Sequence, residues 1–196
     1  MADILIKLMS SMAAQLGHSD LRICQNIAAE LIVSRRQPSP VPAVESFKLP
    51  GLKGVTQKYC SQFNPLLAEY IQQAAPELAW RRPGFGRIPD DIAKHMAVCE
   101  IIGPTGQLNH ENIRAGLLYQ AAGITYPRHS HAAEEIYAPL SGPAEWQRDD
   151  EDWKSRNAGE YIHHLPYQPH GIKTGKIPLL AVWGWTGDIR SESYEI

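Results

Sequence analysis

Apolar residues recur at helical spacing in three stretches of the first half of the chain. One run spans residues 4–16, a second spans 21–32, and a third spans residues 65–75. Positions three and four apart share one face of an α-helix, so each run predicts a helix with one buried stripe. The residues of these stripes are Ile4, Leu5, Leu8, Met12, Leu16, Leu21, Cys24, Ile27, Ala28, Leu31, Ile32, Leu66, Leu67, Tyr70 and Ile71.

Proline and glycine interrupt this helical pattern twice. The Pro-rich stretch at residues 37–43 predicts a linker, since each proline removes a backbone donor and disfavours helix in the residue before it. The segment from Trp80 to Gly86 breaks the chain again, and the Pro/Gly-rich residues 82–90 are a candidate lid.

From about Met96 the pattern changes to short apolar runs separated by Gly, Pro and Asn. Several short strands at regular spacing predict a sandwich or a barrel. The fold class expected is therefore mainly β, preceded by an α-helical N-terminal region. The predicted strands cover residues 96–102, 113–121, 135–140, 144–148, 159–164, 171–174 and 179–186.

Composition removes several functional classes. The chain has 196 residues, 43% of them apolar, and a formal charge of −2, whereas a nucleic-acid binder shows a basic surface. No apolar run is long enough to span a bilayer, and the N-terminus lacks the basic region of a signal peptide. Cys24, Cys60 and Cys99 lack the spacing of a zinc knuckle, which favours buried thiols in a cytoplasmic protein.

One segment concentrates side chains that bind metals. His129 and His131 lie two residues apart, as do Glu135 and Tyr137, so on strands each pair shares a face. His170 follows after a second glycine-bounded segment. Imidazole and carboxylate bind Zn²⁺, Fe²⁺ and related ions, and buried polar groups of this kind need a partner. A single metal ion is the economical partner for all of them.

The spacing of these residues resembles that of the cupin family. Its first motif, Gly-x5-His-x-His-x3-Glu-x6-Gly, fits this chain at every position from Gly123 to Gly142. The second motif is looser: Gly159 to His170 has the right length, but proline falls at 166 and Thr174 replaces the usual asparagine. The resemblance implies a cupin barrel over residues 95–196, with residues 1–94 as a helical region that packs on it.

Three longer segments resemble the cupin-type dimethylsulfoniopropionate (DMSP) lyases of marine bacteria, the DddQ/DddL group. They span residues 126–146, 163–174 and 178–188. These enzymes split DMSP by β-elimination into dimethyl sulfide and acrylate. The resemblance implies a carbon–sulfur lyase with one divalent transition metal ion per chain, namely Zn, Fe, Mn, Co or Ni, because a mixed His/Glu/Tyr site does not select a metal by ligand type.

The resemblance also assigns roles to individual residues. Tyr137 is the expected base, because a nearby cation favours its phenolate form, and the metal is expected to bind the substrate carboxylate. The implied metal ligands are His131, Glu135 and His170, with His129 either a fourth ligand or a partner of a ligand. Tyr126 is expected to line the substrate pocket and assist the base.

The zwitterionic substrate also needs a place for its sulfonium group. Onium cations are often held over aromatic faces. Trp183 and Trp185 share a face of the predicted last strand and, with Tyr126 and His129, are the expected substrate-binding residues; Tyr167 and Trp146 extend the aromatic supply. Packing in the core is the alternative reading of both Trp183 and Trp185.

Two other functions fit the same motif, because cupins carry many activities. One is another cupin metalloenzyme such as a dioxygenase, which has no need of a phenolate base beside the metal. The other is a non-catalytic cupin that senses a ligand or metal. The partners expected are a small zwitterionic molecule, no nucleic acid and no membrane, in a monomer or a homodimer.

Overall fold

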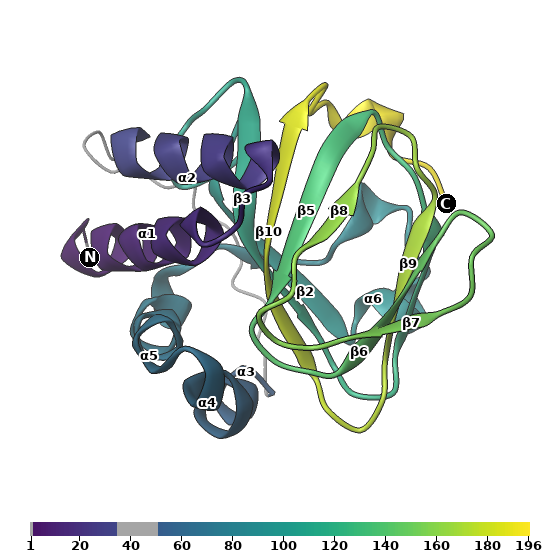
Figure 1. Cartoon of the computed structure of the whole chain (residues 1–196), viewed down its shortest axis with the longest axis horizontal. Coiled ribbons are helices and arrows are strands. Elements are labelled where there is room, and N and C mark those ends of the chain that lie inside the picture. Colours follow the sequence, from purple (N-terminus) through teal and green to yellow (C-terminus); the bar gives the residue numbers. More distant parts are fainter. Residues whose placement is uncertain (1, 35–50) are drawn as a thin grey trace.

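A computed structural model describes residues 2–34 and 51–196 of the chain. Helical elements dominate the first part of these ranges, and most of the ten strands lie in the second part (Figure 1). The helical elements are α1 (Ala2–Gly17), α2 (Arg22–Ser34), α3 (Leu52–Val55), η1 (Thr56–Cys60), α4 (Ser61–Phe63), α5 (Pro65–Ala74), η2 (Ala75–Glu77), η3 (Gly84–Gly86), α6 (Asp90–Ala93) and η4 (Ser191–Ser193).

The strands form two antiparallel sheets that face each other as a barrel. They are β1 (Trp80–Arg81), β2 (Met96–Ile102), β3 (Ile113–Gln120), β4 (Thr125–His129), β5 (Ala133–Pro139), β6 (Ala144–Arg148), β7 (Lys154–Arg156), β8 (Ile162–His164), β9 (His170–Thr174) and β10 (Leu179–Gly187). One sheet has the order β1-β2-β3-β10-β5-β8, and the other has the order β4-β9-β6-β7. This is the cupin barrel that the motif predicted.

Two apolar cores lie on opposite faces of the six-stranded sheet. Helices α1 and α2 cover its outer face, as Figure 1 shows, and pack there against residues such as Ile136 and Val182. The inner face meets the four-stranded sheet, where Trp183 belongs to the same core as Trp146 and Ile172. Strands that are buried on both faces carry continuous apolar runs, which explains the sequence of β10.

Local sequence signals explain where several elements begin. The side chain of Asn64 accepts a hydrogen bond from the backbone N–H of Leu67 at 3.1 Å, and Pro65 occupies the first turn, so α5 starts with a capped end. Gly123 and Gly159, which open the two motifs, have φ angles of 74° and 89°. Glycine adopts this left-handed conformation without steric cost, which explains both motif positions.

Most predicted elements are present, and three strands were missed. The three predicted helices correspond to α1, α2 and α5, and the seven predicted strands correspond to β2, β3, β5, β6, β8, β9 and β10. Strands β1, β4 and β7 were not predicted. The proline linker at 37–43 lies outside the described residues, and the division into two regions at residue 94 stays a prediction.

The cysteines and the lengths of the helices test two further expectations from the sequence. Cys24, Cys60 and Cys99 are all free and buried, as predicted. Within the two described ranges, no helix is both long and apolar enough to cross a membrane.

Candidate metal centre and active site

Strand pairing brings the predicted ligands together inside the barrel. His129 at the end of β4 is paired with His170 at the start of β9. Glu135 on β5 lies between Trp185 on β10 and His164 on β8. His131 lies in the short connection between β4 and β5, so the loop carries it to the same end of the barrel.

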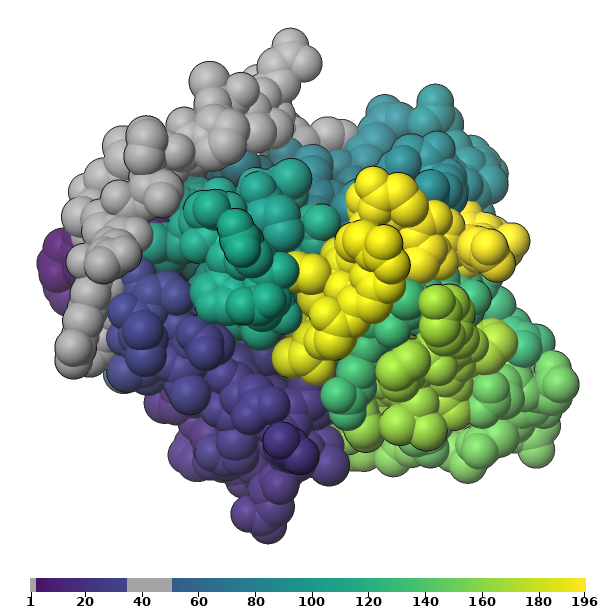
Figure 2. All heavy atoms as spheres, turned by 90° about the horizontal axis from the view of Figure 1, so that it is seen from above, coloured from purple at the N-terminus to yellow at the C-terminus, as the bar shows by residue number. Residues whose placement is uncertain are grey.

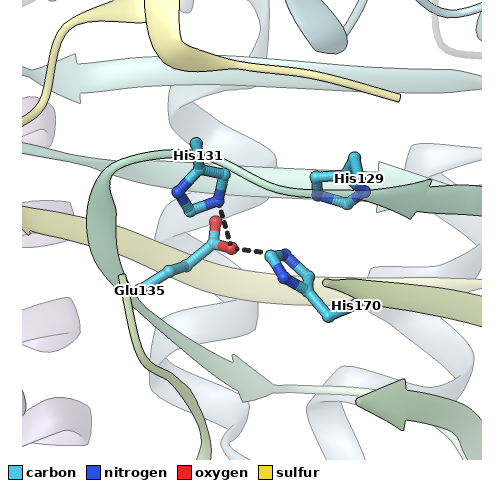
Figure 3. Close-up of side chains that lie close together, drawn as sticks. All are labelled: His129, His131, Glu135 and His170. Atoms are coloured by element: carbon cyan, nitrogen blue, oxygen red, sulfur yellow. Dashed lines mark hydrogen bonds and ion pairs between the residues drawn. The ribbon is translucent and has the colours of Figure 1, made fainter. Parts of the chain in front are cut away.

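The four residues form a compact buried cluster, shown in Figure 3. One ligand atom from each of His129, His131, Glu135 and His170 lies within 4.8 Å of the others. The Nε2 atoms of His131 and His170 lie 3.1 and 2.9 Å from the same oxygen of Glu135, its Oε2. Trp185 donates its indole N–H to the other oxygen at 2.6 Å. All three expected ligands, together with His129, are therefore brought to one point.

Each histidine of the cluster is held by a backbone carbonyl. The Nδ1 atoms of His129, His131 and His170 lie 2.9, 3.1 and 2.8 Å from the carbonyl oxygens of Pro127, Ala133 and Gln168, respectively. A carbonyl oxygen only accepts, so each Nδ1 carries a proton and donates it. In a neutral ring this leaves Nε2 with its lone pair directed into the cluster, which is the usual arrangement of a metal-binding histidine.

This arrangement requires a positive charge at its centre. Two Nε2 lone pairs and a carboxylate oxygen would otherwise face one another in a buried site, which is unfavourable. A divalent cation satisfies all of them at once, so the residues present fit a bound metal ion. Burial alone would raise the pKa of Glu135, but positive charge in the cluster, which protonated His131 and His170 supply when no cation is bound, outweighs it and holds that pKa well below its ordinary value. The carboxyl group is therefore an anionic ligand.

Tyr137 lies beside the cluster, on the same face of β5 as Glu135. Its ring centroid lies 6.0 Å from that of His164 and 6.5 Å from that of His170. Burial is the largest cause that raises the pKa of Tyr137 well above its ordinary value, and the Glu135 carboxylate is the next. Without an added cation the hydroxyl therefore stays protonated, whereas a cation at the cluster opposes the effect of Glu135.

Aromatic rings surround the cavity that adjoins the cluster. Tyr126 stacks on His129 with ring centroids 4.4 Å apart, and its hydroxyl lies 3.1 Å from the hydroxyl of Tyr194. Trp183 and Trp185, which share a face of β10, both line the cavity. The cavity is lined by Arg81, Pro83, Gly84, Phe85, Val98, Leu118, Tyr126, His129, Glu135, Tyr137, Trp183, Trp185 and Tyr194.

Other residues singled out in the sequence occupy varied positions. Tyr167 is 64% exposed and does not line this cavity, whereas Trp146 is buried in the barrel core. The adjacent histidines face opposite ways: His163 bonds to Glu134 at 2.7 Å near the surface, and His164 is fully buried. The ring of His164 stacks on His170 at 3.9 Å, and neither of its nitrogens has a hydrogen-bond partner in the described part of the chain.

Sequence reasoning did not assign the charged or aromatic residues Arg81, Phe85 and Tyr194 to the cavity wall, although Phe85 lies in the candidate lid at residues 82–90. Arg81 and Phe85 lie in the segment interpreted as a break in the chain, and Tyr194 lies in the C-terminal segment. Arg87 donates to the carbonyl of Ser191 at 3.1 Å, so the two segments meet. In Figure 2 the yellow C-terminal segment runs across this face of the molecule beside the blue-green part of the chain. No motif linked these segments to the histidines.

The fold and the cluster define a cupin barrel with a candidate metal site. The chain belongs to the dimethylsulfoniopropionate lyase family, whose sequence model matches residues 17–181. It is 32% identical over 113 residues to dimethylsulfoniopropionate lyase DddQ of Ruegeria pomeroyi, a match that covers 57% of this chain and 56% of the relative. It is also 32% identical over 123 residues to a putative dimethylsulfoniopropionate lyase, DddL, of Cereibacter sphaeroides, covering 62% and 51%. The chain spans about half the length of the curated relatives it matches.

Solved structures share the fold over nearly the whole chain. The crystal structure of DMSP lyase DddQ from Ruegeria pomeroyi has a TM-score of 0.74 at 23% identity, covering 96% of this chain and 93% of that one. A structure described with the DMSP lyases RdDddP and RnDddQII has a TM-score of 0.72 at 19% identity, covering 100% and 99%. These structures share the cupin fold of the chain, and the match to the family model confirms the resemblance expected from the motifs.

Proposed function

We propose that this protein is a metal-dependent DMSP lyase that releases dimethyl sulfide and acrylate by β-elimination. The observation that carries the proposal is the juxtaposition of Tyr137 with a buried cluster of three histidines and Glu135. The backbone carbonyls that bind each Nδ1 keep the Nε2 atoms available for a cation. Membership of a family named for this reaction supports the substrate and the activity.

The residues around the cluster would perform the reaction as follows. The phenolate oxygen of Tyr137 removes the proton from the carbon α to the carboxylate. The electron pair of that C–H bond forms the Cα=Cβ double bond, the Cβ–S bond breaks, and its pair stays on sulfur. The sulfonium leaves as neutral dimethyl sulfide, acrylate remains, and Tyr137 holds the proton until it passes to solvent.

His131, Glu135 and His170 would hold the metal ion, with His129 as a fourth ligand or as a partner of a ligand. The bound cation supplies Lewis-acid stabilisation of the negative charge that develops on the substrate carboxylate. It also favours the phenolate form of Tyr137, whose pKa burial and the Glu135 charge otherwise raise.

The aromatic wall would position the other end of the substrate. Trp183 and Trp185 contribute aromatic surface to the cavity wall, and aromatic rings suit a sulfonium cation. Tyr126, stacked on His129 and bonded to Tyr194, would assist the base by fixing the shape of the cavity on the side of the cluster. Its pKa is raised by burial, so its hydroxyl stays a neutral hydrogen-bonding group.

The test is headspace gas chromatography for dimethyl sulfide, with purified protein, DMSP and each candidate metal in turn. We expect metal-dependent release that falls about 10²–10⁴-fold in Tyr137→Phe, the usual contribution of a positioned base, with the metal still bound. Tyr119→Phe is the matched control, because Tyr119 is also buried but belongs to the outer core. Absence of sulfide with every metal would reject the lyase activity.

A further inference from the structure

Two arginines share one carboxylate at the edge of the cavity. Arg114 donates to Glu100 Oε2 at 2.8 Å, and both the hydroxyl and the backbone N–H of Thr105 donate to the same carboxylate at 2.9 Å. Arg81 also donates to Glu100 Oε2, but at 3.3 Å. Glu100 is therefore largely satisfied by Arg114 and Thr105, and this group of two arginines and one acid keeps one positive charge in excess.

The strand register shows that Arg81, which carries the excess positive charge, faces the cavity. Arg81 pairs with Val98 between β1 and β2, and Val98 lines the cavity. Trp80, the residue before Arg81 on β1, pairs with Cys99. Both Trp80 and Cys99 belong to the core under the helices. Because side chains alternate along a strand, Trp80 faces the helices while Arg81 faces the inside of the barrel.

Arg81 lies at the open end of this cavity. Its side chain is 28% exposed, whereas those of His131, Glu135 and His170 are at most 3% exposed. Its guanidinium carbon lies 5.2 Å from the ring centroid of Phe85, which also lines the cavity. In residues 2–34 and 51–196, neither Nε nor Nη1 of this guanidinium has a hydrogen-bond acceptor.

The charge of Arg81 also acts on the inner part of the cavity. Arg81 lines the same cavity as Tyr126 and Glu135. A cation in the wall of a largely buried cavity attracts an anionic ligand in that cavity through space.

We propose that Arg81 forms a carboxylate-binding subsite at the entrance of the cavity, separate from the histidine cluster. The guanidinium matches the geometry of a carboxylate and has free N–H donors for it. It would capture the carboxylate of the substrate as it enters and bind the carboxylate of the product as it leaves. The identity of these two acids rests on the proposed lyase function, whereas the subsite itself would bind any small aliphatic carboxylate.

The experiment compares acrylate binding by calorimetry in the full chain, both loaded with Zn²⁺ and after chelation. We expect Arg81→Gln to weaken acrylate binding about tenfold in both forms, as expected for loss of one charge-assisted hydrogen bond. Arg81→Lys keeps the charge and should recover part of the affinity. Arg82→Gln is the matched control, since Arg82 pairs with Asp90 at the surface and does not line the cavity.

Kinetics with DMSP provide a second measurement. Arg81→Gln should raise KM about tenfold and leave kcat within about twofold, because the subsite acts on binding of the carboxylate and not on proton removal. Zinc content measured on each variant shows whether the cluster is intact.

The outcomes separate the subsite from the lyase activity. Equal acrylate affinity of Arg81→Gln and the unsubstituted protein, or an equal loss in Arg82→Gln, would overturn the subsite even if dimethyl sulfide is released. Acrylate binding that depends on Arg81 in a protein that releases no sulfide would support the subsite and reject the lyase function.

Discussion

Gly184 lies on β10 between the two tryptophans of the cavity, and its own face of the strand meets helix α2. A Cβ atom added at this position would lie 2.5 Å from Cδ1 of Ile27, far inside contact distance. The next nearest atom is the carbonyl oxygen of Arg114 at 3.4 Å, which is an ordinary contact. Ile27 is fully buried in the core under the helices, so moving its Cδ1 atom aside means displacing packed neighbours. We expect Gly184→Ala to destabilise the protein by about 1–3 kcal/mol through overpacking.

The source of that loss can be isolated with a double-mutant cycle. Ile27→Val removes the Cδ1 atom that the new methyl group would meet, at a cost of about 0.5–1.5 kcal/mol on its own. If the two changes were independent, the double variant would lose about 1.5–4.5 kcal/mol. Because the valine opens space for the alanine, we expect the double variant to lose at least about 1 kcal/mol less than that sum.

The assay is urea unfolding of the metal-free protein, followed by tryptophan fluorescence and analysed by linear extrapolation. Gly175→Ala is the control, since a Cβ there has no atom within 4 Å. Additivity of the Gly184 and Ile27 changes within about 0.5 kcal/mol would refute the proposed contact between α2 and β10.

Three further predictions concern the site and the cores. His131→Ala should lower metal affinity at least about tenfold, measured by metal content after dialysis, whereas His163→Ala should retain the metal because its side chain is near the surface. Tyr194→Phe removes the hydrogen bond to Tyr126 and should destabilise the protein by about 1 kcal/mol in urea unfolding; an unchanged midpoint would contradict this bond. Burial raises the pKa of the Cys99 thiol to about 12, so unfolding, which restores an ordinary thiol pKa, should become easier as pH rises from about 9 to about 12. Cys99→Ala should reduce this alkaline loss of stability, as measured by unfolding at pH 8 and 10.5.

The cluster was predictable because its spacing is local. His129, His131 and Glu135 lie within seven positions of one another, and a strand–loop–strand segment brings such neighbours together whatever the rest of the chain does. The motif glycine Gly123 marks the turn before β4. Only His170 had to be supplied by a distant segment, and the second motif, although irregular, identified it.

The cavity wall was not predictable in this way. Strand β4 contains Thr125, Pro127 and Arg128, so apolar and polar residues do not alternate clearly along it. Strand β1 has only two residues, which is too short for a recognisable pattern. Arg81 and Tyr194 are both more than forty positions from His129, with which they line the cavity. Their positions depend on the pairing of β1 with β2 and on the path of the C-terminal segment, which are set by tertiary packing and not by a local pattern.

The backbone carbonyls that bind the cluster histidines have an evolutionary consequence. Each of these three carbonyls belongs to a residue two positions from its histidine, and any amino acid supplies a carbonyl. The orientation of the imidazole rings is thus specified by the course of the main chain and not by the identity of neighbouring side chains. Pro127, Ala133 and Gln168 can therefore be replaced during sequence divergence without loss of the ligand geometry, provided that the strand ends keep their path. Each unit of three residues, from a histidine to the residue whose carbonyl binds it, does not depend on neighbouring side chains. Such units are therefore suitable for transfer to another antiparallel barrel by backbone grafting.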